Sequence, residues 1–339
     1  MMSDFPFKLF LPVSVFICGL LLYLYIKIGG KQKIHDIPNE RSSHSRIVIR
    51  GGGIILFLVN LFVFSFEPCI DTLVLSLGLS IGVITGFFDD LGGLGTKLRF
   101  VLYLIATYFV LFGALPSVGF SLLVWIPLVI VSLGVVNCYN FMDGINGMTA
   151  SYSIVLLSSS LAISYAIHAR QFDHTILLYL AFFIAFLFLN FRKNALLFLG
   201  DSGSVTMGLL AAFLIVYFGV YLHTWSTVVL LGVYGVDSVG TIVIRLLKRE
   251  NIFEAHRSHL YQDLVHKKNW DHRAVSLLYA ALQGVLSIGY VLLIHSSYLE
   301  MYSACSLVVL TILYTASKLG LYGDGLLKKD AQEITKEFI

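Results

Sequence analysis

Long runs of hydrophobic residues, separated by short polar stretches, fill most of the chain. A helix needs about 20 apolar residues to cross the hydrocarbon core of a bilayer. The pattern therefore predicts an all-α, polytopic membrane protein with about eleven transmembrane helices. The predicted spans are residues 9–28, 52–67, 71–88, 99–115, 119–136, 149–168, 174–190, 203–222, 224–244, 274–295 and 299–319.

No internal repeat or low-complexity stretch divides the chain. We therefore expect one membrane domain, residues 1–319. The last segment, residues 320–339, is instead rich in Lys, Asp and Glu, which predicts a soluble cytoplasmic tail.

Composition supports the membrane assignment. Of the 339 residues, 58% are hydrophobic and only 13% are charged, which excludes a water-soluble globular protein. None of the four cysteines forms a C-x-x-C pair, so we expect neither a disulfide framework nor a zinc site. The basic residues are not interleaved with aromatic ones in the manner of nucleic-acid-binding proteins, and we expect no DNA or RNA partner.

The distribution of Lys and Arg predicts the topology. The first span has no small-residue cleavage site and is followed by Lys31 and Lys33, so we interpret it as a retained span with its N-terminus outside. In this orientation 21 of the 23 Lys and Arg residues lie inside, and only Lys8 and Arg170 lie outside. An odd number of spans places the C-terminus in the cytoplasm. The long loops are also inside, and we expect the function there.

Five acidic residues lie at the predicted cytoplasmic ends of spans: Asp89, Asp90, Asp143, Asp201 and, slightly deeper, Asp237. A charge near the hydrocarbon costs roughly 2.5–3.5 kcal/mol, so such residues are usually retained for function. Together they predict a metal and phosphate site, and hence an enzyme.

Asp89 and Asp90 end a span that runs from outside to inside. Adjacent carboxylates at the negative end of a helix dipole are unfavourable unless a cation lies nearby. A solvated turn of Asp and Gly is the alternative. Lys97 follows where the chain returns to the membrane. It either lies close to a bound phosphate or serves only as a cytoplasmic anchor.

Asn137, Asn140, Asp143 and Asn146 recur every three residues, which places them along one stripe of a helical turn. Amide and carboxylate oxygens are hard ligands that suit Mg²⁺. A plain turn rich in Asn, Asp and Gly is the alternative. The absence of Lys and Arg at this inner end favours a functional cluster.

Two glycine-containing segments begin predicted spans. Asp201, between Gly200 and Ser202, would either cap its helix or hold a metal that bridges to phosphate oxygens at the helix N-terminus. These two roles are compatible. Residues 50–53, an arginine followed by three glycines, would let backbone N–H groups approach an anion, or they form a flexible lead into the second span.

The longest polar loop, residues 245–273, contains His256, Arg257 and His259. A guanidinium can fork onto a diphosphate, and an imidazole can donate to it. Two histidines three residues apart could instead bind zinc, but no third ligand stands at a suitable spacing.

Taken in order, these motifs resemble the polyprenyl-phosphate N-acetylhexosamine-1-phosphate transferases of glycosyltransferase family 4, which include the phospho-MurNAc-pentapeptide translocases. The resemblance covers roughly residues 30–265. The motifs that carry it are residues 38–44 (PNERSSH), residues 50–53 (RGGG), Asp89 and Asp90 with Lys97, Asn137, Asn140 and Asp143 with Gly144, residues 200–204 (GDSGS), and the histidine-containing loop.

The resemblance implies a multi-pass enzyme of the bacterial inner membrane, with an active site that faces the cytoplasm. Such an enzyme transfers a sugar 1-phosphate from a UDP-sugar to undecaprenyl phosphate, releases UMP and uses Mg²⁺. As partners we therefore expect the UDP-sugar, undecaprenyl phosphate and membrane lipid, and we leave a homodimer open.

The resemblance also implies a role for each candidate residue. Mg²⁺ would be held by Asn140 and Asp201. Either Asp89 or Asp90 would be the base or the charge partner of the attacking lipid phosphate, and Lys97 would hold the diphosphate. The residues implied to bind the donor are Asn137, Asp143, Asn146, His256, Arg257 and His259.

The donor sugar is suggested by the last loop. Many relatives have adjacent histidines there, whereas this chain has the sequence HRSH at residues 256–259. That form resembles the subgroup that begins the O-antigen of lipopolysaccharide with a 6-deoxy sugar such as N-acetylfucosamine or N-acetylquinovosamine. A UDP-N-acetylglucosamine-specific member of the family is the alternative. A secondary transporter is a third reading, but transporter sites lie near the midplane on broken helices.

Overall fold

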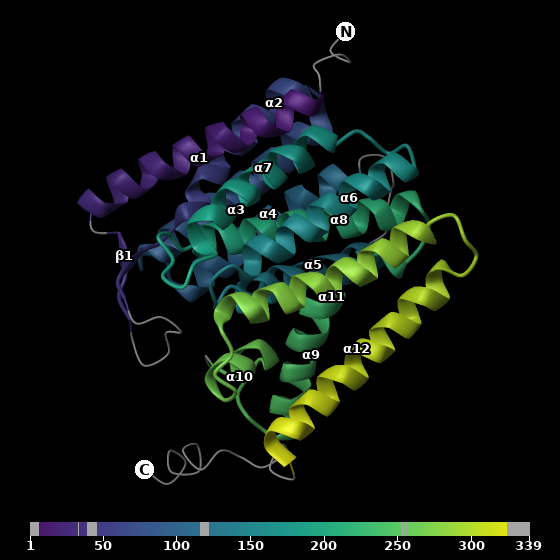
Figure 1. Cartoon of the computed structure of the whole chain (residues 1–339). Helices are drawn as coiled ribbons and strands as arrows, with labels where there is room; N and C mark the ends of the chain where they lie inside the picture. The colour runs from purple at the N-terminus through teal and green to yellow at the C-terminus, as the bar shows by residue number, and fades with distance from the viewer. Residues whose placement is uncertain are drawn as a thin grey trace.

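The computed structural model describes residues 7–32, 34–38, 46–115, 122–252, 254 and 256–323, and it consists mainly of long helices (Figure 1). The prediction of an all-α membrane protein is confirmed. The helices are α1 (Phe7–Gln32), η1 (Gly52–Ile54), α2 (Ile55–Phe66), α3 (Ile70–Asp90), α4 (Thr96–Ala114), α5 (Leu122–Met142), α6 (Met148–Ala166), α7 (Asp173–Asn190), α8 (Asp201–Tyr221), η2 (Ser226–Leu231), α9 (Gly232–Leu247), α10 (Leu260–His266), α11 (His272–Leu292) and α12 (Leu299–Tyr322). Two short antiparallel strands, β1 (His35–Asp36) and β2 (Val48–Ile49), follow α1.

Ten helical segments of the described chain are long and apolar enough to cross a membrane, one fewer than predicted. The difference lies in the second predicted span, residues 52–67. There η1 and α2 form a shorter apolar segment, Gly52–Phe66. Its start follows the left-handed backbone of Gly51, whose φ is 81°. It ends before Pro68, which disfavours a helical conformation at Glu67.

Two predicted features fall partly beyond the described residues. Helix α12 continues to Tyr322, past the boundary predicted at residue 319. Residues 324–339, most of the predicted tail, lie outside the described residues, as do residues 39–44 of the PNERSSH motif. The division into a membrane domain and a tail therefore stays a prediction.

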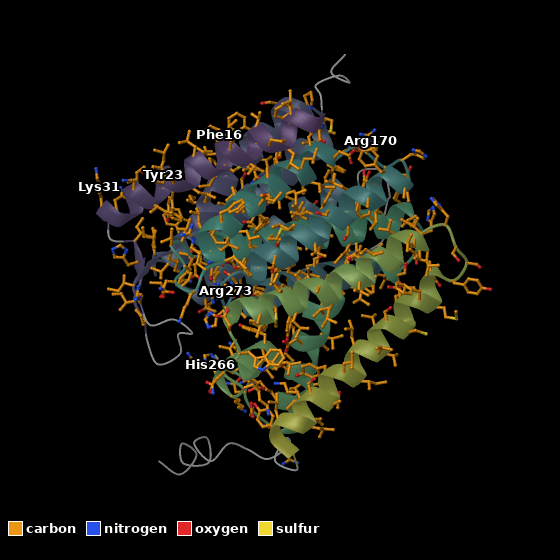
Figure 2. The ribbon with its side chains drawn as sticks, in the orientation of Figure 1. Phe16, Tyr23, Lys31, Arg170, His266 and Arg273 are labelled. Carbon is orange, nitrogen blue, oxygen red and sulfur yellow. The ribbon has the colours of Figure 1, made fainter. Side chains whose placement is uncertain are left out.

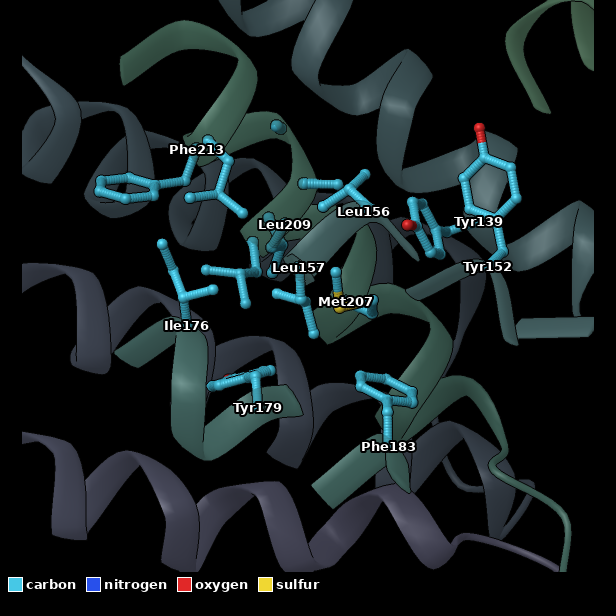
Figure 3. Packing of buried hydrophobic residues seen from close by; sticks show 14 of the residues in the cluster. Tyr139, Tyr152, Leu156, Leu157, Ile176, Tyr179, Phe183, Met207, Leu209 and Phe213 are labelled. Atoms are coloured by element: carbon cyan, nitrogen blue, oxygen red, sulfur yellow. The ribbon is translucent and has the colours of Figure 1, made fainter. Parts of the chain in front are cut away.

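Helix α8 lies at the centre of the bundle and is buried along nearly its whole length. Such a helix is hydrophobic on every side and is stable only when other helices surround it. Figure 3 shows Leu209 and Phe213 of α8 in one cluster with Leu156 of α6 and Ile176 of α7.

Glycines let the start of α8 approach its neighbours closely. A Cβ atom on Gly53 of η1 would lie 2.1 Å from the backbone nitrogen of Gly203. A Cβ atom on Gly86 of α3 would lie 2.5 Å from the carbonyl carbon of Asp201. Neither position has room for a side chain, so the start of α8 is packed directly against η1 and α3. This packing brings the acidic end of α3 next to Asp201.

Charged side chains lie at the two ends of the bundle. Figure 2 places Lys31, His266 and Arg273 at one end and Arg170 at the other. This arrangement agrees with the predicted separation of Arg170 from the other basic residues. Which end faces the cytoplasm stays a prediction.

Candidate functional site

The centre of the candidate site is the carboxylate of Asp90, the last residue of α3. Its side chain is fully buried and forms an ion pair with Arg50, with 2.8 Å between Arg50 Nε and Asp90 Oδ1. It also accepts hydrogen bonds from the backbone nitrogens of Asp201 (2.9 Å) and Ser202 (3.2 Å) and from Ser202 Oγ (3.1 Å). Asp90 therefore caps the start of α8, where the helix dipole is positive.

This cap explains how a carboxylate is tolerated at the end of α3. The positive end of α8 and Arg50 together supply the favourable charge that α3 itself does not. Gly200 is required beside it, because a Cβ atom there would lie 2.3 Å from Asp90 Oδ2 and the residue has a φ of 76°.

The two expected anion sites made of backbone N–H groups are occupied by the protein itself. At the start of α8, the amides of Asp201 and Ser202 donate to Asp90, and the role of Asp201 as a ligand of a metal that bridges to phosphate stays a prediction. In the glycine run, Gly52 donates to the Phe198 carbonyl (3.0 Å) and Gly53 to the Leu199 carbonyl (2.9 Å). The glycine run instead packs closely against the backbone of Phe198 and Leu199.

Asp89 and Asp201 keep some exposure, with 13% and 23% of their side chains accessible. Their carboxyl groups interact with each other. Arg99 forms an ion pair with Asp89, and Arg50 Nη2 lies 3.3 Å from Asp201 Oδ1. Two guanidinium groups thus face three carboxylates, including Asp90, and the excess negative charge favours a bound cation.

Asn140 and Asp143, at the end of α5, complete this acidic site. Asn140 Nδ2 donates to Ser204 Oγ in the first turn of α8 (3.3 Å). Asp143 accepts a hydrogen bond from Thr149 Oγ1 (2.6 Å). The pKa of Asp143 is raised to about 7. Burial is the main cause and the charge of Asp201 adds to it, while the hydrogen bond from Thr149 acts in the opposite direction.

The oxygen atoms of this acidic site fit Mg²⁺. In the described part of the chain, no three His, Cys, Asp or Glu side chains converge as a metal site. Mg²⁺ does not need such a cage, because it commonly binds one or two protein oxygens and shares its other positions between water and phosphates. Asp201, with Asn140 beside it, would hold the ion, which would neutralise phosphate charge.

For three expected site residues, the described part of the chain shows no hydrogen bond to the carboxylates of this acidic site. Asn137 donates to the carbonyl of Leu133 in its own helix (2.9 Å). Asn146 is buried, and its amide nitrogen donates to the carbonyl of Arg192 (2.8 Å). Lys97 is exposed, and we find no hydrogen bond or ion pair from it to any residue that the structure describes. Their roles as ligands of a substrate stay predictions.

Residues 256–259, called here the histidine loop, lie beside the end of α5. The ring of Phe141 is 6.2 Å from that of His256 and 5.6 Å from that of His259, measured between centroids. Tyr261 Oη donates to the Phe141 carbonyl (2.8 Å). The expected proximity of this loop to the helix ends is therefore observed, and half-buried Arg257 lies within it.

Asp237 was expected to belong with the other four acidic residues, but it acts elsewhere. Its carboxylate accepts hydrogen bonds from the backbone nitrogens of Leu260 (2.8 Å) and Tyr261 (3.3 Å) and from Tyr279 Oη (2.6 Å). Buried His259 lies against it, with 3.5 Å between Nδ1 and Oδ1. Asp237 thus caps α10 and supports the histidine loop.

His256 is neutral at physiological pH. Burial lowers its pKa to about 3, and the nearby charges of His259, Arg245 and Lys318 act in the same direction. Its Nδ1 lies 2.9 Å from Ser258 Oγ. A neutral imidazole has one N–H, so His256 can offer one hydrogen bond to a ligand but no positive charge.

Arg50 and Arg99 form ion pairs with the carboxylates of the acidic site, which the sequence patterns did not reveal. The sequence patterns identified Arg50 only as the neighbour of three glycines and Arg99 only as one of the basic residues on the inner side. The proximity of Arg99 to Asp89 could have been predicted from the sequence. Arg99 follows the short turn between α3 and α4 and so lies at the same end of the bundle as Asp89.

Comparison with known proteins relates this geometry to a family. The family model for glycosyl transferase family 4 matches residues 72–219, the segment that carries Asp89, Asp90, Asn140 and Asp201. This central segment of the chain resembles glycosyl transferase family 4. The region matched by the family 4 model runs from α3 to α8 and includes every carboxylate of the acidic site, whereas the histidine loop lies beyond it.

Proteins similar to this chain include two N-acetylglucosaminyl 1-phosphate transferases. A probable undecaprenyl-phosphate N-acetylglucosaminyl 1-phosphate transferase of Bacillus subtilis is 28% identical over 75% of this chain and 77% of its own length. The undecaprenyl-phosphate alpha-N-acetylglucosaminyl 1-phosphate transferase of Thermotoga maritima is 29% identical over 70% of this chain and 76% of its own length. A phospho-N-acetylmuramoyl-pentapeptide-transferase of Streptococcus equi subsp. zooepidemicus is 28% identical over 56% of this chain and 65% of its own length.

Proposed function

We propose that this protein transfers a sugar 1-phosphate from a UDP-sugar to undecaprenyl phosphate. An oxygen of the lipid phosphate attacks the sugar-bound phosphorus of the donor, the bond between the two donor phosphates breaks, and UMP leaves. The proposal is supported by the names of the relatives and by one observation above all. The Asp89 and Asp201 carboxylates lie together at one end of a membrane bundle, where a soluble donor and a lipid phosphate can meet.

The residues of the site suit this reaction. Phosphoryl transfer depends chiefly on positioning and on charge neutralisation. Asn140 and Asp201 hold Mg²⁺, and Asp89 is the base or the charge partner of the lipid phosphate. Asp90 positions α8 instead, because both of its carboxylate oxygens are already engaged by Arg50, Asp201 and Ser202. This assigns different roles to two adjacent carboxylates.

The donor is bound between the acidic site and the histidine loop. Lys97 and Arg257 hold the diphosphate, and the nucleotide and sugar are bound by Asn137, Asp143, Asn146, His256 and His259. The site faces the cytoplasm of a bacterial inner membrane, with the N-terminus outside and the C-terminus inside, and the product begins a lipid-linked O-antigen. We propose a UDP-6-deoxy-N-acetylhexosamine as donor, and UDP-N-acetylglucosamine is the second candidate because two relatives carry that activity in their names.

The test is a transfer assay with purified protein, Mg²⁺, undecaprenyl phosphate and a panel of UDP-sugars, followed by UMP release. Release that requires the lipid phosphate supports the transferase. Equal or better use of UDP-N-acetylglucosamine would overturn the 6-deoxy assignment alone. No UMP release with any donor would overturn the proposed reaction.

A further inference from the structure

One face of α12 carries three polar side chains spaced by four residues: Tyr314, Lys318 and Tyr322. The rest of this helix is largely apolar and exposed, as expected for a peripheral helix in contact with lipid (Figure 1). The three polar groups all bind α9 or α10. Tyr314 Oη lies 2.9 Å from Thr241 Oγ1 of α9, and Tyr322 Oη donates to Asp263 of α10 (2.9 Å).

The middle residue of this face is a buried cation. Only 2% of Lys318 is exposed. Its ammonium group donates to Asp263 Oδ2 (2.6 Å) and to the backbone carbonyl of Ser258. A buried charge is unfavourable unless it is paired and hydrogen-bonded, and it often contributes more to a specific geometry than to stability. The buried contact of Lys318 therefore indicates that it fixes the backbone at Ser258.

That backbone position belongs to the histidine loop. Ser258 lies between the two histidines, and its Oγ is 2.9 Å from His256 Nδ1. The same Ser258 carbonyl lies 3.5 Å from Thr241 Oγ1. Lys318 thus reaches from the peripheral helix to the middle of the loop, while Asp237 of α9 binds the backbone nitrogen of Leu260, directly after the loop.

We propose that Lys318 is a positioning residue that fixes the histidine loop in the geometry that binds the sugar nucleotide. This inference rests on the proposed function of the site. Because Lys318 lies behind the loop and contacts no residue of the acidic site in the described part of the chain, its effect should concern the UDP-sugar and not the lipid phosphate.

The matched pair of variants is Lys318→Met and Lys267→Met. Lys267 also pairs with Asp263, with 3.2 Å between Nζ and Oδ1, but its side chain is 44% exposed. It has no hydrogen bond to Ser258 in the structure as described. We expect Lys318→Met to raise the KM for the UDP-sugar about tenfold, with kcat and the KM for undecaprenyl phosphate within about twofold of native. Such a split indicates lost donor binding. Lys267→Met should leave all three values within about twofold.

Hydrogen exchange of residues 256–262 gives a readout that does not depend on activity. Lys318→Met should accelerate exchange in this segment, and Lys267→Met should not. Unchanged exchange, or equal changes in both KM values, would overturn the inference even if the native protein is an active transferase. An inactive native protein would overturn the proposed reaction, and the exchange result would still decide whether Lys318 holds the loop.

A milder variant covers the case in which Lys318→Met does not fold. Tyr322→Phe removes the hydroxyl that binds Asp263 and keeps the ring and Lys318. We expect a two- to threefold higher KM for the UDP-sugar and a smaller acceleration of exchange in residues 256–262. If a folded Tyr322→Phe protein equals the native protein in both measurements and Lys318→Met does not fold, the inference is rejected.

Discussion

The carboxylate of Asp90 accepts a 2.9 Å hydrogen bond from the backbone nitrogen of Asp201, so the last residue of α3 caps the first turn of α8. This contact orients Asp201 next to Asp89 at the end of the bundle. It also uses the negative charge of one carboxylate to stabilise a helix terminus. Of two neighbouring aspartates, one is therefore available for chemistry and the other is part of the framework.

The first prediction separates these two roles. Asp89→Asn should lower kcat by about 10²–10⁴, the usual contribution of a general base, and leave thermal stability near native. Asp90→Asn should instead lower the melting temperature, because it removes the negative charge that pairs with Arg50 and stabilises the start of α8, a contribution of about 0.3–2 kcal/mol at a helix N-terminus. The measurements are thermal unfolding in detergent and UMP release per folded molecule. If the Asp90→Asn protein is as stable as the native protein but has a much lower kcat, Asp90 takes part in catalysis.

The second prediction concerns the metal. Asp201→Asn and Asn140→Ala should abolish turnover by removing oxygen ligands, and a Mg²⁺ titration should show weaker activation of any residual rate. Asn140 also donates to Ser204 Oγ, so Ser204→Ala is the matched control that removes this hydrogen bond and keeps the ligand. We expect Ser204→Ala to keep most of its activity. Near-normal activity of Asn140→Ala would exclude it as a ligand.

The limits of sequence reasoning are visible in particular residues. Apolar runs sufficed to predict ten of the eleven spans, because crossing a bilayer requires length and hydrophobicity, whereas the segment Gly52–Phe66 is shorter than predicted. The different contacts of Asp89 and Asp90 could not be predicted, since they depend on Asp201, more than 100 positions away in the chain. Lys318 had been counted among the basic residues of the inner loops and tail, yet it is buried by α10, which the sequence pattern did not place.

The third prediction tests the close contact between η1 and α8. Gly53→Ala places a Cβ atom 2.1 Å from the backbone of Gly203, and overpacking of this kind costs about 1–3 kcal/mol. The melting temperature and the activity should therefore both fall, because the start of α8 must shift. Gly134→Ala is the control: nothing lies within 4 Å of its Cβ position in α5, and alanine favours a helix by up to about 1 kcal/mol. Equal stability of the two variants would contradict the packing argument.

The fourth prediction concerns the pH dependence of stability and follows from Asp143. Burial raises its pKa to about 7 in the folded protein, whereas an aspartate in the unfolded chain has a pKa of about 4. Between these values the folded state binds the proton that the unfolded chain releases, so this residue lowers stability as pH rises through that window. Asp143→Asn keeps an acceptor for Thr149 and removes the titration.

We therefore expect Asp143→Asn to gain stability relative to the native protein as pH rises from about 4 to 7, with no further gain above that range. Thermal unfolding across pH, without Mg²⁺, measures this. Asp271→Asn gives the opposite sign, and its effect is confined to pH below about 4. Exposed Asp271 has its pKa lowered by hydrogen bonds from Arg273, so its carboxylate stabilises the fold at neutral pH and loses that effect in acid. A constant difference between Asp143→Asn and native across this range would show that the pKa of Asp143 is not raised in the folded protein.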